Sequence, residues 1–220
     1  MSELQAVLFD MDGTICDSEP SWMASERAMA ARYGAEWTDD DALHLVGFAL
    51  MDGGTYIKQR MGLPQSPADV VDELVAGVME SLARDGVAWR PGALELLQAC
   101  NDAGVPTALV TMSYRDFCGA VLAVMPHGRF DVVVTGDEVD RGKPAPDPYL
   151  AAARQLGVDP ACCVAIEDSP TGAASAQAAG CLTVVVPNHV EVPLTDGMLS
   201  RSSVGDLTVE ELRRLMATKG

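Results

Sequence analysis

A short run of apolar residues near the N-terminus, Ala6 to Phe9, ends abruptly at Asp10, Asp12 and Gly13. An unbroken apolar run of this length is typical of a strand buried on both faces of a parallel sheet. In open α/β sheets, ligands bind beyond the carboxyl ends of the strands. The two acids are therefore predicted to lie at a ligand-binding crevice. A plain polar turn is the alternative interpretation, since Asp and Gly are common turn residues.

The rest of the chain divides into a helical stretch and an α/β alternation. Residues 17–90 contain helical patterns and no convincing strand, and regular alternation of strands and helices begins after Pro91. Such alternation is typical of a doubly wound parallel sheet. We therefore expect an α/β fold with a Rossmann-like core formed by residues 1–16 and 91–220, into which an all-helical cap domain, residues 17–90, is inserted. The segment 188–203 resembles a loop. Strands are predicted over 4–9, 106–110, 130–135, 162–166 and 182–186, and helices over 20–33, 40–46, 52–61, 68–84, 92–103, 114–125, 148–156, 170–179 and 208–216.

Composition narrows the class of protein. The formal net charge of −17 argues against a nucleic-acid partner, whose binding requires a footprint of lysine and arginine. Neither a signal peptide nor a membrane-spanning run is expected, because no apolar run approaches the roughly 20 residues that cross a bilayer. The six cysteines form neither a C-x-x-C pair nor a zinc-type spacing, so we expect reduced, mostly buried thiols. These features predict a soluble cytoplasmic protein, which we expect to be a monomer or a weak homodimer.

Four segments together resemble the signatures of the haloacid dehalogenase-like (HAD) hydrolase superfamily, in the expected order. They are Asp10–Thr14, Leu109–Ser113, Gly142–Asp147 and Val164–Ser169. One such match is weak, whereas four in order across most of the chain are specific. The chain is most similar to the β-phosphoglucomutase-like and sugar-phosphatase subfamily, which carries a helical (C1) cap. Between 17 and 90 the resemblance extends only to position and helical character.

The resemblance assigns chemistry to the first two acids. A carboxylate such as Asp10 can attack phosphorus as a nucleophile and form an aspartyl-phosphate that water then hydrolyses. Asp12 would donate a proton to the leaving oxygen and later accept one from water. The dehalogenase branch of the superfamily typically lacks this second acid, because a halide needs no proton. Asp12 therefore favours phosphoryl transfer.

A metal ion and further charged groups are also implied. Carboxylates beside a phosphate need a cation, and hard oxygen ligands suit Mg²⁺. By resemblance, the ligands would be Asp10, Asp168 and the backbone carbonyl of Asp12, with Glu167 as an additional ligand or a supporting partner. Glu167-Asp168 before Ser169 is also compatible with a helix start.

The resemblance also predicts how the phosphate is bound. Lys143 would place its charge against the phosphoryl group, although a lysine before proline is ordinarily a solvated loop residue. Thr111 would bind a phosphate oxygen through its hydroxyl and N–H, and Met11, Asp12 and Met112 would contribute further contacts. The stretch from Gly136 to Lys143 is not a nucleotide P-loop, because its glycine spacing is wrong and Pro144 follows the lysine.

The predicted function is a Mg²⁺-dependent phosphatase acting on a small phosphate monoester, such as a sugar phosphate. The same-class alternative is a phosphosugar mutase, but Leu50 and Trp22 stand where such mutases carry an arginine and a histidine. A third interpretation is a signalling module that accepts phosphate on an aspartate. Arg27, His44 and Arg60 are candidates to face the substrate, although ordinary surface roles are the simpler interpretation.

Overall fold

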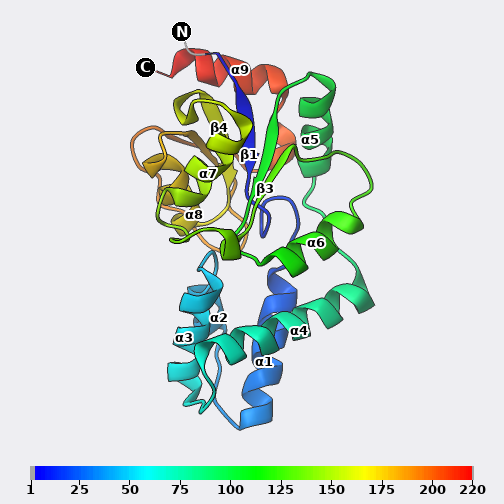
Figure 1. Ribbon diagram of the computed structural model, residues 1–220, viewed down its shortest axis with the longest axis vertical. Helices are drawn as coiled ribbons and strands as arrows, with labels where there is room; N and C mark the ends of the chain where they lie inside the picture. The colour runs from blue at the N-terminus through cyan, green and yellow to red at the C-terminus, as the bar shows by residue number, and fades with distance from the viewer. Residues whose placement is uncertain (1–2, 220) are drawn as a thin grey trace.

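One parallel sheet of six strands, ordered β3-β2-β1-β4-β5-β6, forms the centre of the described chain (Figure 1). The computed structural model describes residues 3–219. The chain builds the sheet outward from β1 to one side and then returns to the other, so β1 and β4 lie at the point where the strand order reverses. The predicted doubly wound fold is confirmed, and this reversal point is where such sheets bind ligands. The strands are β1 (Ala6–Phe9), β2 (Thr107–Val110), β3 (Val132–Val134), β4 (Cys163–Glu167), β5 (Leu182–Val185) and β6 (Met198–Ser200).

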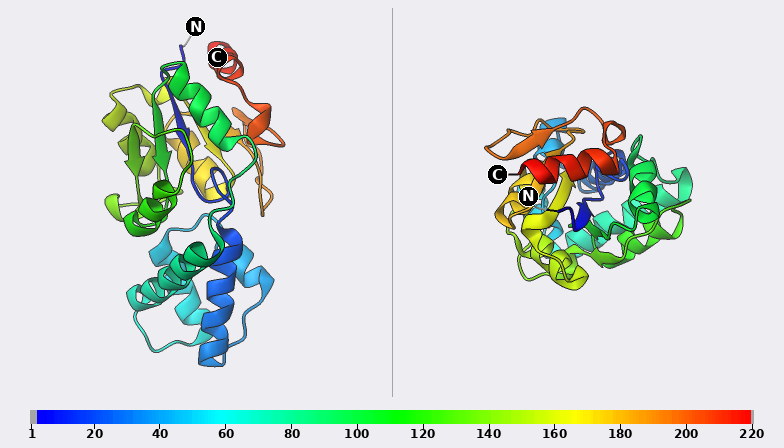
Figure 2. Two further views of the ribbon diagram at one scale, coloured as in Figure 1. Left: turned by 90° about the vertical axis from the view of Figure 1, so that its right-hand side faces the viewer. Right: turned by 90° about the horizontal axis from the view of Figure 1, so that it is seen from above.

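Helices cover both faces of the sheet (Figure 2). α7 and α8 pack on one face, and α5 and α9 on the other. The side chains of β1 alternate between two hydrophobic clusters, with Val7 and Phe9 in one and Ala6 and Leu8 in the other. Because both faces are buried, this strand has no polar position. The core helices are α5 (Ala93–Asp102), α6 (Arg115–Ala123), α7 (Asp147–Leu156), α8 (Pro170–Ala178) and α9 (Val209–Thr218).

Between β1 and α5 the chain forms a group of four helices, here called the four-helix insertion. It extends beyond the carboxyl edge of the sheet in Figure 1. Its ends carry ordinary helix signals: Pro20 opens the first helix, Gly34 closes it in a left-handed conformation, and Ser66 with Asp69 forms a capping box before the last. α4 packs against both α1 and α3. The helices are α1 (Glu19–Tyr33), α2 (Asp39–His44), α3 (Leu50–Met61) and α4 (Pro67–Asp85).

The sixth strand corrects the prediction of a loop over 188–203. β6 has only three residues, and it extends the sheet by pairing in parallel with β5, with Leu199 opposite Val184. It lies at the sheet edge and its side chains are half-buried or exposed. A strand this short shows no recognisable alternation, which explains why the pattern missed it.

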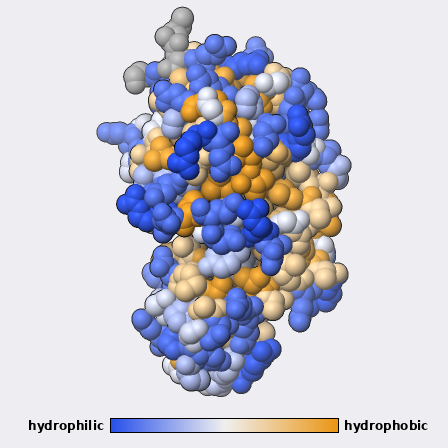
Figure 3. All heavy atoms as spheres, in the orientation of Figure 1, coloured by the Kyte–Doolittle hydropathy of each residue, from blue (hydrophilic) through white to orange (hydrophobic). Residues whose placement is uncertain are grey.

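The surface and the cysteines complete the description. On the face of Figure 3 the two ends of the molecule are largely hydrophilic, while apolar residues come to the surface near its middle. All six cysteines are free thiols, and all but Cys162 are buried. No helix within residues 3–219 combines the length and the hydrophobicity needed to cross a membrane.

Candidate active site

Three carboxylates meet at the carboxyl edge of the sheet. Asp10 directly follows β1, Glu167 ends β4, and Asp168 follows it. Because β1 and β4 pair with Phe9 opposite Ile166, the acids emerge side by side. One oxygen from each carboxylate lies within 4.8 Å of the other two, and all three side chains are buried. Gly13 permits this close packing: its φ is +87°, and a Cβ there would lie 1.9 Å from Asp168 Oδ2.

Lys143 lies inside this acidic cluster. Its Nζ donates to Asp10 Oδ1 and to Glu167 Oε1, both at 2.6 Å, and to the carbonyl oxygen of Val110 at 2.9 Å. Glu167 Oε1 also accepts a hydrogen bond of 2.6 Å from the hydroxyl of Tyr149. Lys143 is only 4% exposed, so the solvated-loop interpretation is wrong. Glu167 therefore holds the ammonium group of Lys143 in place, and Lys143 in turn holds the carboxylate of Asp10 in place.

The cluster combines three buried carboxyl groups with a single lysine. Burial raises the pKa of Asp10 to about 8, although Lys143 opposes the shift. Burial, followed by the neighbouring Asp10 and Glu167, raises the pKa of Asp168 well above its usual value. Burial disfavours the charge of Lys143, but the two carboxylates that it contacts outweigh this and raise its pKa. A hard divalent cation such as Mg²⁺ fits such a cluster, because it prefers oxygen ligands and favours the ionised form of the carboxyl groups.

Asp12 lies in a different environment, among hydroxyl groups. Its Oδ2 accepts hydrogen bonds from Thr111 Oγ1 at 3.0 Å and from Ser113 Oγ at 2.8 Å, while Ser18 Oγ donates to Oδ1. The sequence interpretation singled out Thr111 but missed Ser18 and Ser113. Ser113 belongs to the second signature segment and follows Thr111 by two residues, which is the one signal that pointed to it. The hydroxyls fix both oxygens of Asp12.

The predicted role of the Thr111 backbone is wrong. Its N–H donates to the carbonyl oxygen of Val134 at 3.0 Å, within the β2–β3 pairing, and is therefore not free to bind phosphate. In contrast, the N–H groups of Met11, Asp12 and Met112 donate to no acceptor among the described residues. Backbone N–H groups without acceptors at the end of a strand can bind the oxygens of an anion.

A cavity of about 700 Å³, mouth included, lies between the acidic cluster and the four-helix insertion. Thr111, Met11 and Glu167 do not line it, so the cavity wall offers no support for the predicted phosphate contacts of Thr111 and Met11. The insertion contributes mostly apolar residues, including Trp22 and Leu50, the two positions where mutases are expected to carry polar side chains. The core side is Asp10, Asp12, Met112, Ser113, Lys143, Asp168 and Ser169; the insertion side is Glu19, Trp22, Glu26, Leu45, Gly47, Phe48, Ala49, Leu50, Gly53, Gly54, Ile57 and Leu74.

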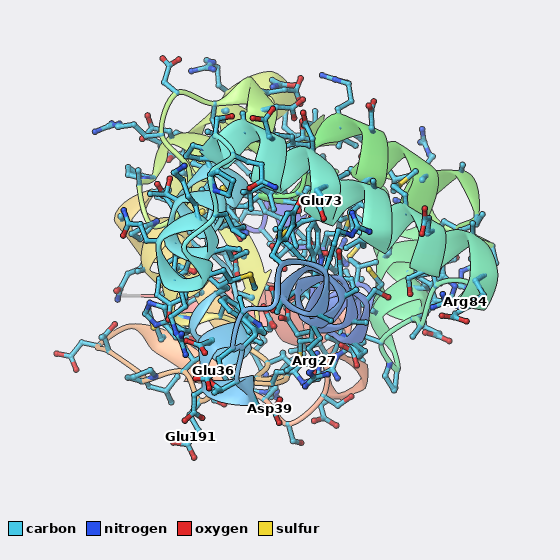
Figure 4. All side chains as sticks on the ribbon, turned by 90° about the horizontal axis from the view of Figure 1, so that it is seen from below. Arg27, Glu36, Asp39, Glu73, Arg84 and Glu191 are labelled. Atoms are coloured by element: carbon cyan, nitrogen blue, oxygen red, sulfur yellow. The ribbon has the colours of Figure 1, made fainter. Side chains whose placement is uncertain are left out.

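None of the three basic side chains considered in the insertion lines this cavity. Arg27 pairs with Asp39 at 2.6 Å, on the outer surface that Figure 4 shows from below. Arg60 donates to both oxygens of Asp41, at 2.8 and 3.0 Å. The ring of His44 packs against the aromatic rings beside it in the insertion. The simpler surface and structural roles therefore hold for these residues.

Two glutamates that the sequence interpretation missed line the cavity instead. Burial raises the pKa of Glu19 to about 8, with contributions from Glu26 and Asp12, and burial raises the pKa of Glu26 to about 7. Glu26 is 3% exposed, and its Oε2 accepts a hydrogen bond of 3.1 Å from Trp37 Nε1. The spacing of Glu19, Trp22 and Glu26 along one helix face was the available signal.

Comparisons with known proteins agree with this geometry. Residues 4–180 match the family model described as haloacid dehalogenase-like hydrolase. Hexitol phosphatase A of Escherichia coli is 33% identical over 215 residues, covering 96% of this chain and 93% of that protein. Protein CbbY of Rhodobacter capsulatus is 35% identical over 200 residues, covering 85% and 87%. The crystal structure of CbbY from Rhodobacter sphaeroides in complex with xylulose-(1,5)bisphosphate has a TM-score of 0.83 and 27% identity, covering 95% and 99%.

These matches extend over nearly the whole chain and include the segments that carry the acidic cluster, the lysine and the hydroxyls around Asp12. The chain therefore belongs to the haloacid dehalogenase-like hydrolase family, and its relatives place it among the phosphatase enzymes of that family.

Proposed function

We propose that this protein is a Mg²⁺-dependent phosphatase that hydrolyses a small phosphate monoester, such as a sugar phosphate, through an aspartyl-phosphate intermediate. One observation carries the proposal: Asp10, held by Lys143, and Asp12, held by three hydroxyls, lie at the floor of one cavity. A nucleophile next to a separately positioned acid is the arrangement that covalent phosphoryl transfer requires. The hexitol phosphatase relative supports a phosphorylated sugar or polyol as the substrate class.

In the first step, a carboxylate oxygen of Asp10 attacks phosphorus. Oδ1 is held by Lys143, whereas Oδ2 accepts no hydrogen bond from the described residues and is therefore the attacking atom. As the new O–P bond forms, the bond from phosphorus to the ester oxygen breaks. Asp12 gives its proton to this leaving oxygen, so the alcohol part of the substrate departs as a neutral molecule and the phosphoryl group stays on Asp10.

In the second step, water attacks the phosphorus of the aspartyl-phosphate. Asp12, now ionised, accepts the proton of this water, and the Asp10 carboxylate leaves with its electron pair, which releases inorganic phosphate. Throughout, the N–H groups of Asp12 and Met112, which line the cavity, would bind the phosphoryl oxygens. Lys143 offsets the charge that develops on them.

The residues proposed to hold Mg²⁺ are Asp10, Asp168 and the backbone carbonyl of Asp12. When bound, the ion supplies positive charge that lets a phosphate approach the carboxylates. Glu167 belongs to the same cluster, but its Oε1 already accepts two hydrogen bonds, from Lys143 and Tyr149. We therefore assign Glu167 mainly to holding Lys143, with metal binding as its secondary role.

We further propose that residues 17–90 form a cap domain over a catalytic core of residues 1–16 and 91–220. The loop before α3 lies directly on the core, because Thr171 Oγ1 donates to the carbonyl oxygen of Gly47 at 2.8 Å. A cap in contact with the core encloses the substrate and excludes water other than the attacking molecule. It would also keep Asp12 close to the leaving oxygen.

The charge of the cavity favours a phosphatase over a phosphosugar mutase. A mutase must bind a bisphosphate intermediate, and the second phosphate needs a cationic partner. Among the described residues, Lys143 is the only Lys, Arg or His that lines the cavity, and it is already committed to the first phosphate. A test for isomerisation of β-glucose 1-phosphate in the presence of glucose bisphosphate should therefore give no product.

Phosphate release from a panel of sugar phosphates, polyol phosphates and nucleotides tests the proposed function. We expect release by the wild-type protein with Mg²⁺, none with EDTA, and a loss of about 10³-fold or more in Asp10→Asn. Circular dichroism would show that this variant is folded. Substantial release by pure, folded Asp10→Asn would refute Asp10 as the nucleophile, and release that EDTA leaves unchanged would refute the metal requirement.

A further inference from the structure

One face of α1 carries an unusual set of side chains into the cavity. Glu19, Trp22 and Glu26 follow one another at three- and four-residue spacing, and all three line the space above the acidic cluster. Glu19 lies next to Ser18, which binds Asp12, and therefore marks the catalytic end of this face. Glu26 is two turns further on, about 10 Å along the helix axis from Glu19.

Glu26 is a buried carboxyl group with spare hydrogen-bonding capacity. Its Oε2 is held by Trp37, but its Oε1 accepts no hydrogen bond from the described residues. This oxygen is not fully enclosed by protein atoms, and Glu26 lines the cavity, so a ligand there can reach it and supply the missing hydrogen bond. Neither Glu19 oxygen accepts a side-chain hydrogen bond among residues 3–219, so the second carboxyl on this face is also free to bind a ligand.

The surroundings of Glu26 restrict what that ligand can be. The neighbouring cavity wall is apolar, with Leu45, Ile57 and Leu74 among its residues, and no cation within the described chain lines this part of the cavity. A second phosphate would face two carboxyl groups and no positive charge. An uncharged chain bearing hydroxyl groups, in contrast, offers donors to the carboxyls and C–H surface to Trp22 and the aliphatic wall.

We infer that Glu26 is a specificity-determining residue: with Glu19 it binds hydroxyl groups of the leaving alcohol, and so selects open-chain or cyclic polyol monophosphates long enough to reach it. This inference rests on the proposed phosphatase function. An extended six-carbon chain with its ester oxygen spans about 8 Å, estimated from the C–C bond length. This length is comparable with the rise of about 10 Å between Glu19 and Glu26 along α1, whereas a three-carbon chain with its ester oxygen is only about half as long.

The test compares a hexitol phosphate, sorbitol 6-phosphate, with glycerol 3-phosphate, each assayed for phosphate release with Mg²⁺. For the wild-type chain we expect kcat/KM to favour the hexitol ester by tenfold or more. Glu26→Ala should reduce this ratio about tenfold, mainly through KM for the hexitol ester. Glu26→Gln keeps an oxygen for Trp37 and the ligand, and should restore part of the preference. Glu36→Gln changes an exposed glutamate of the same insertion and is the matched control, with an unchanged ratio (Figure 4).

The outcomes separate the inference from the function on which it rests. A wild-type protein that releases phosphate but prefers neither ester, or a Glu26→Ala protein with the wild-type ratio, overturns the role of Glu26 and leaves the phosphatase in place. Absence of release from every ester overturns the proposed function itself. Thermal unfolding of each variant guards against a false result, because a loss of the fold lowers activity toward both esters and leaves the ratio unchanged.

Discussion

Asp10 and Asp12 are separated by only one residue, but their side chains lie in different surroundings. Asp10 is buried against Lys143, which donates a hydrogen bond to Oδ1, whereas Oδ2 accepts none from the described residues. Asp12 is surrounded by the hydroxyls of Ser18, Thr111 and Ser113, which orient it but carry no charge. These different surroundings are the reason why we propose Asp10 as the nucleophile and Asp12 as the acid and base.

This division of roles predicts a dependence on the leaving group. Asp12→Asn cannot donate a proton, so it should lower kcat/KM for a sugar phosphate by about 10²- to 10⁴-fold. The loss of kcat/KM for p-nitrophenyl phosphate should be much smaller, because nitrophenolate leaves without a proton. Steady-state kcat/KM values measure this difference, because they report the first step and not the hydrolysis of the aspartyl-phosphate that both esters share. Equal losses for the two esters would show instead that Asp12 mainly positions the phosphate.

At the scale of elements, α8 sets the position of Glu167 and, through it, of Lys143. Gly172 lies in the first turn of α8, and a Cβ there would be 2.0 Å from Glu167 Oε2. Because glycine has no Cβ, the Glu167 carboxylate fits directly against the first turn of α8 in the wild-type protein. The geometry of the candidate site thus depends on a glycine that does not line the cavity.

We therefore predict that Gly172→Ala displaces Glu167 and loosens Lys143. kcat should fall by tenfold or more, since small misplacements of catalytic groups are costly. The overpacked side chain should also cost about 1–3 kcal/mol of stability. Gly119→Ala is the matched control: a Cβ at this exposed position of α6 meets no atom within 4 Å, so activity should be unchanged and stability slightly higher. Rates and melting temperatures equal to those of the wild-type protein in Gly172→Ala would contradict the prediction.

The elements also explain what the sequence could and could not predict. Strands such as β1 and β4 were predictable because a buried parallel strand has an unbroken apolar run, and the acids at their ends follow from the sheet topology. β6 was not, because three edge residues form no pattern. Glu26 was missed because a glutamate on an amphipathic helix is usually solvated, and its burial depends on how α1 faces the sheet edge. The N–H of Thr111 was misassigned because the sequence does not reveal that β3 pairs with it.

At the scale of the whole molecule, the cavity exists only because the sheet edge and the four-helix insertion meet. The sheet edge contributes the acidic cluster and Lys143, and the insertion contributes apolar surface with two carboxyl groups. In the function that we propose, reaction and recognition therefore lie on different parts of the chain. The domain boundaries, the cytoplasmic location and the monomeric or weakly dimeric state stay predictions. From the proposed metal site we derive a prediction about the stability of the entire fold.

Mg²⁺ should stabilise the folded protein, and more strongly at high pH. Because the pKa of Asp10 is raised to about 8 without metal, the folded chain holds a proton that the unfolded chain, with a pKa near 3.8, has released. The stability of the metal-free protein should therefore fall as pH rises between these two values. Metal binding must displace this proton, so Mg²⁺ binds more weakly at pH 6 than at pH 8.5.

Melting temperatures with Mg²⁺ and with EDTA at these two pH values measure this coupling. At about 100 times its Kd the ion adds about 2.7 kcal/mol. For a chain of this size that corresponds to a rise of about 5–10 °C at pH 8.5, and the rise should be clearly smaller at pH 6. Asp168→Ala removes one proposed ligand and should lose the rise at both pH values, while its metal-free form melts no lower than the wild type because a buried carboxyl group next to Asp10 is gone. A rise that is equal at both pH values, or that persists in Asp168→Ala, would show that Mg²⁺ binds away from the three carboxylates.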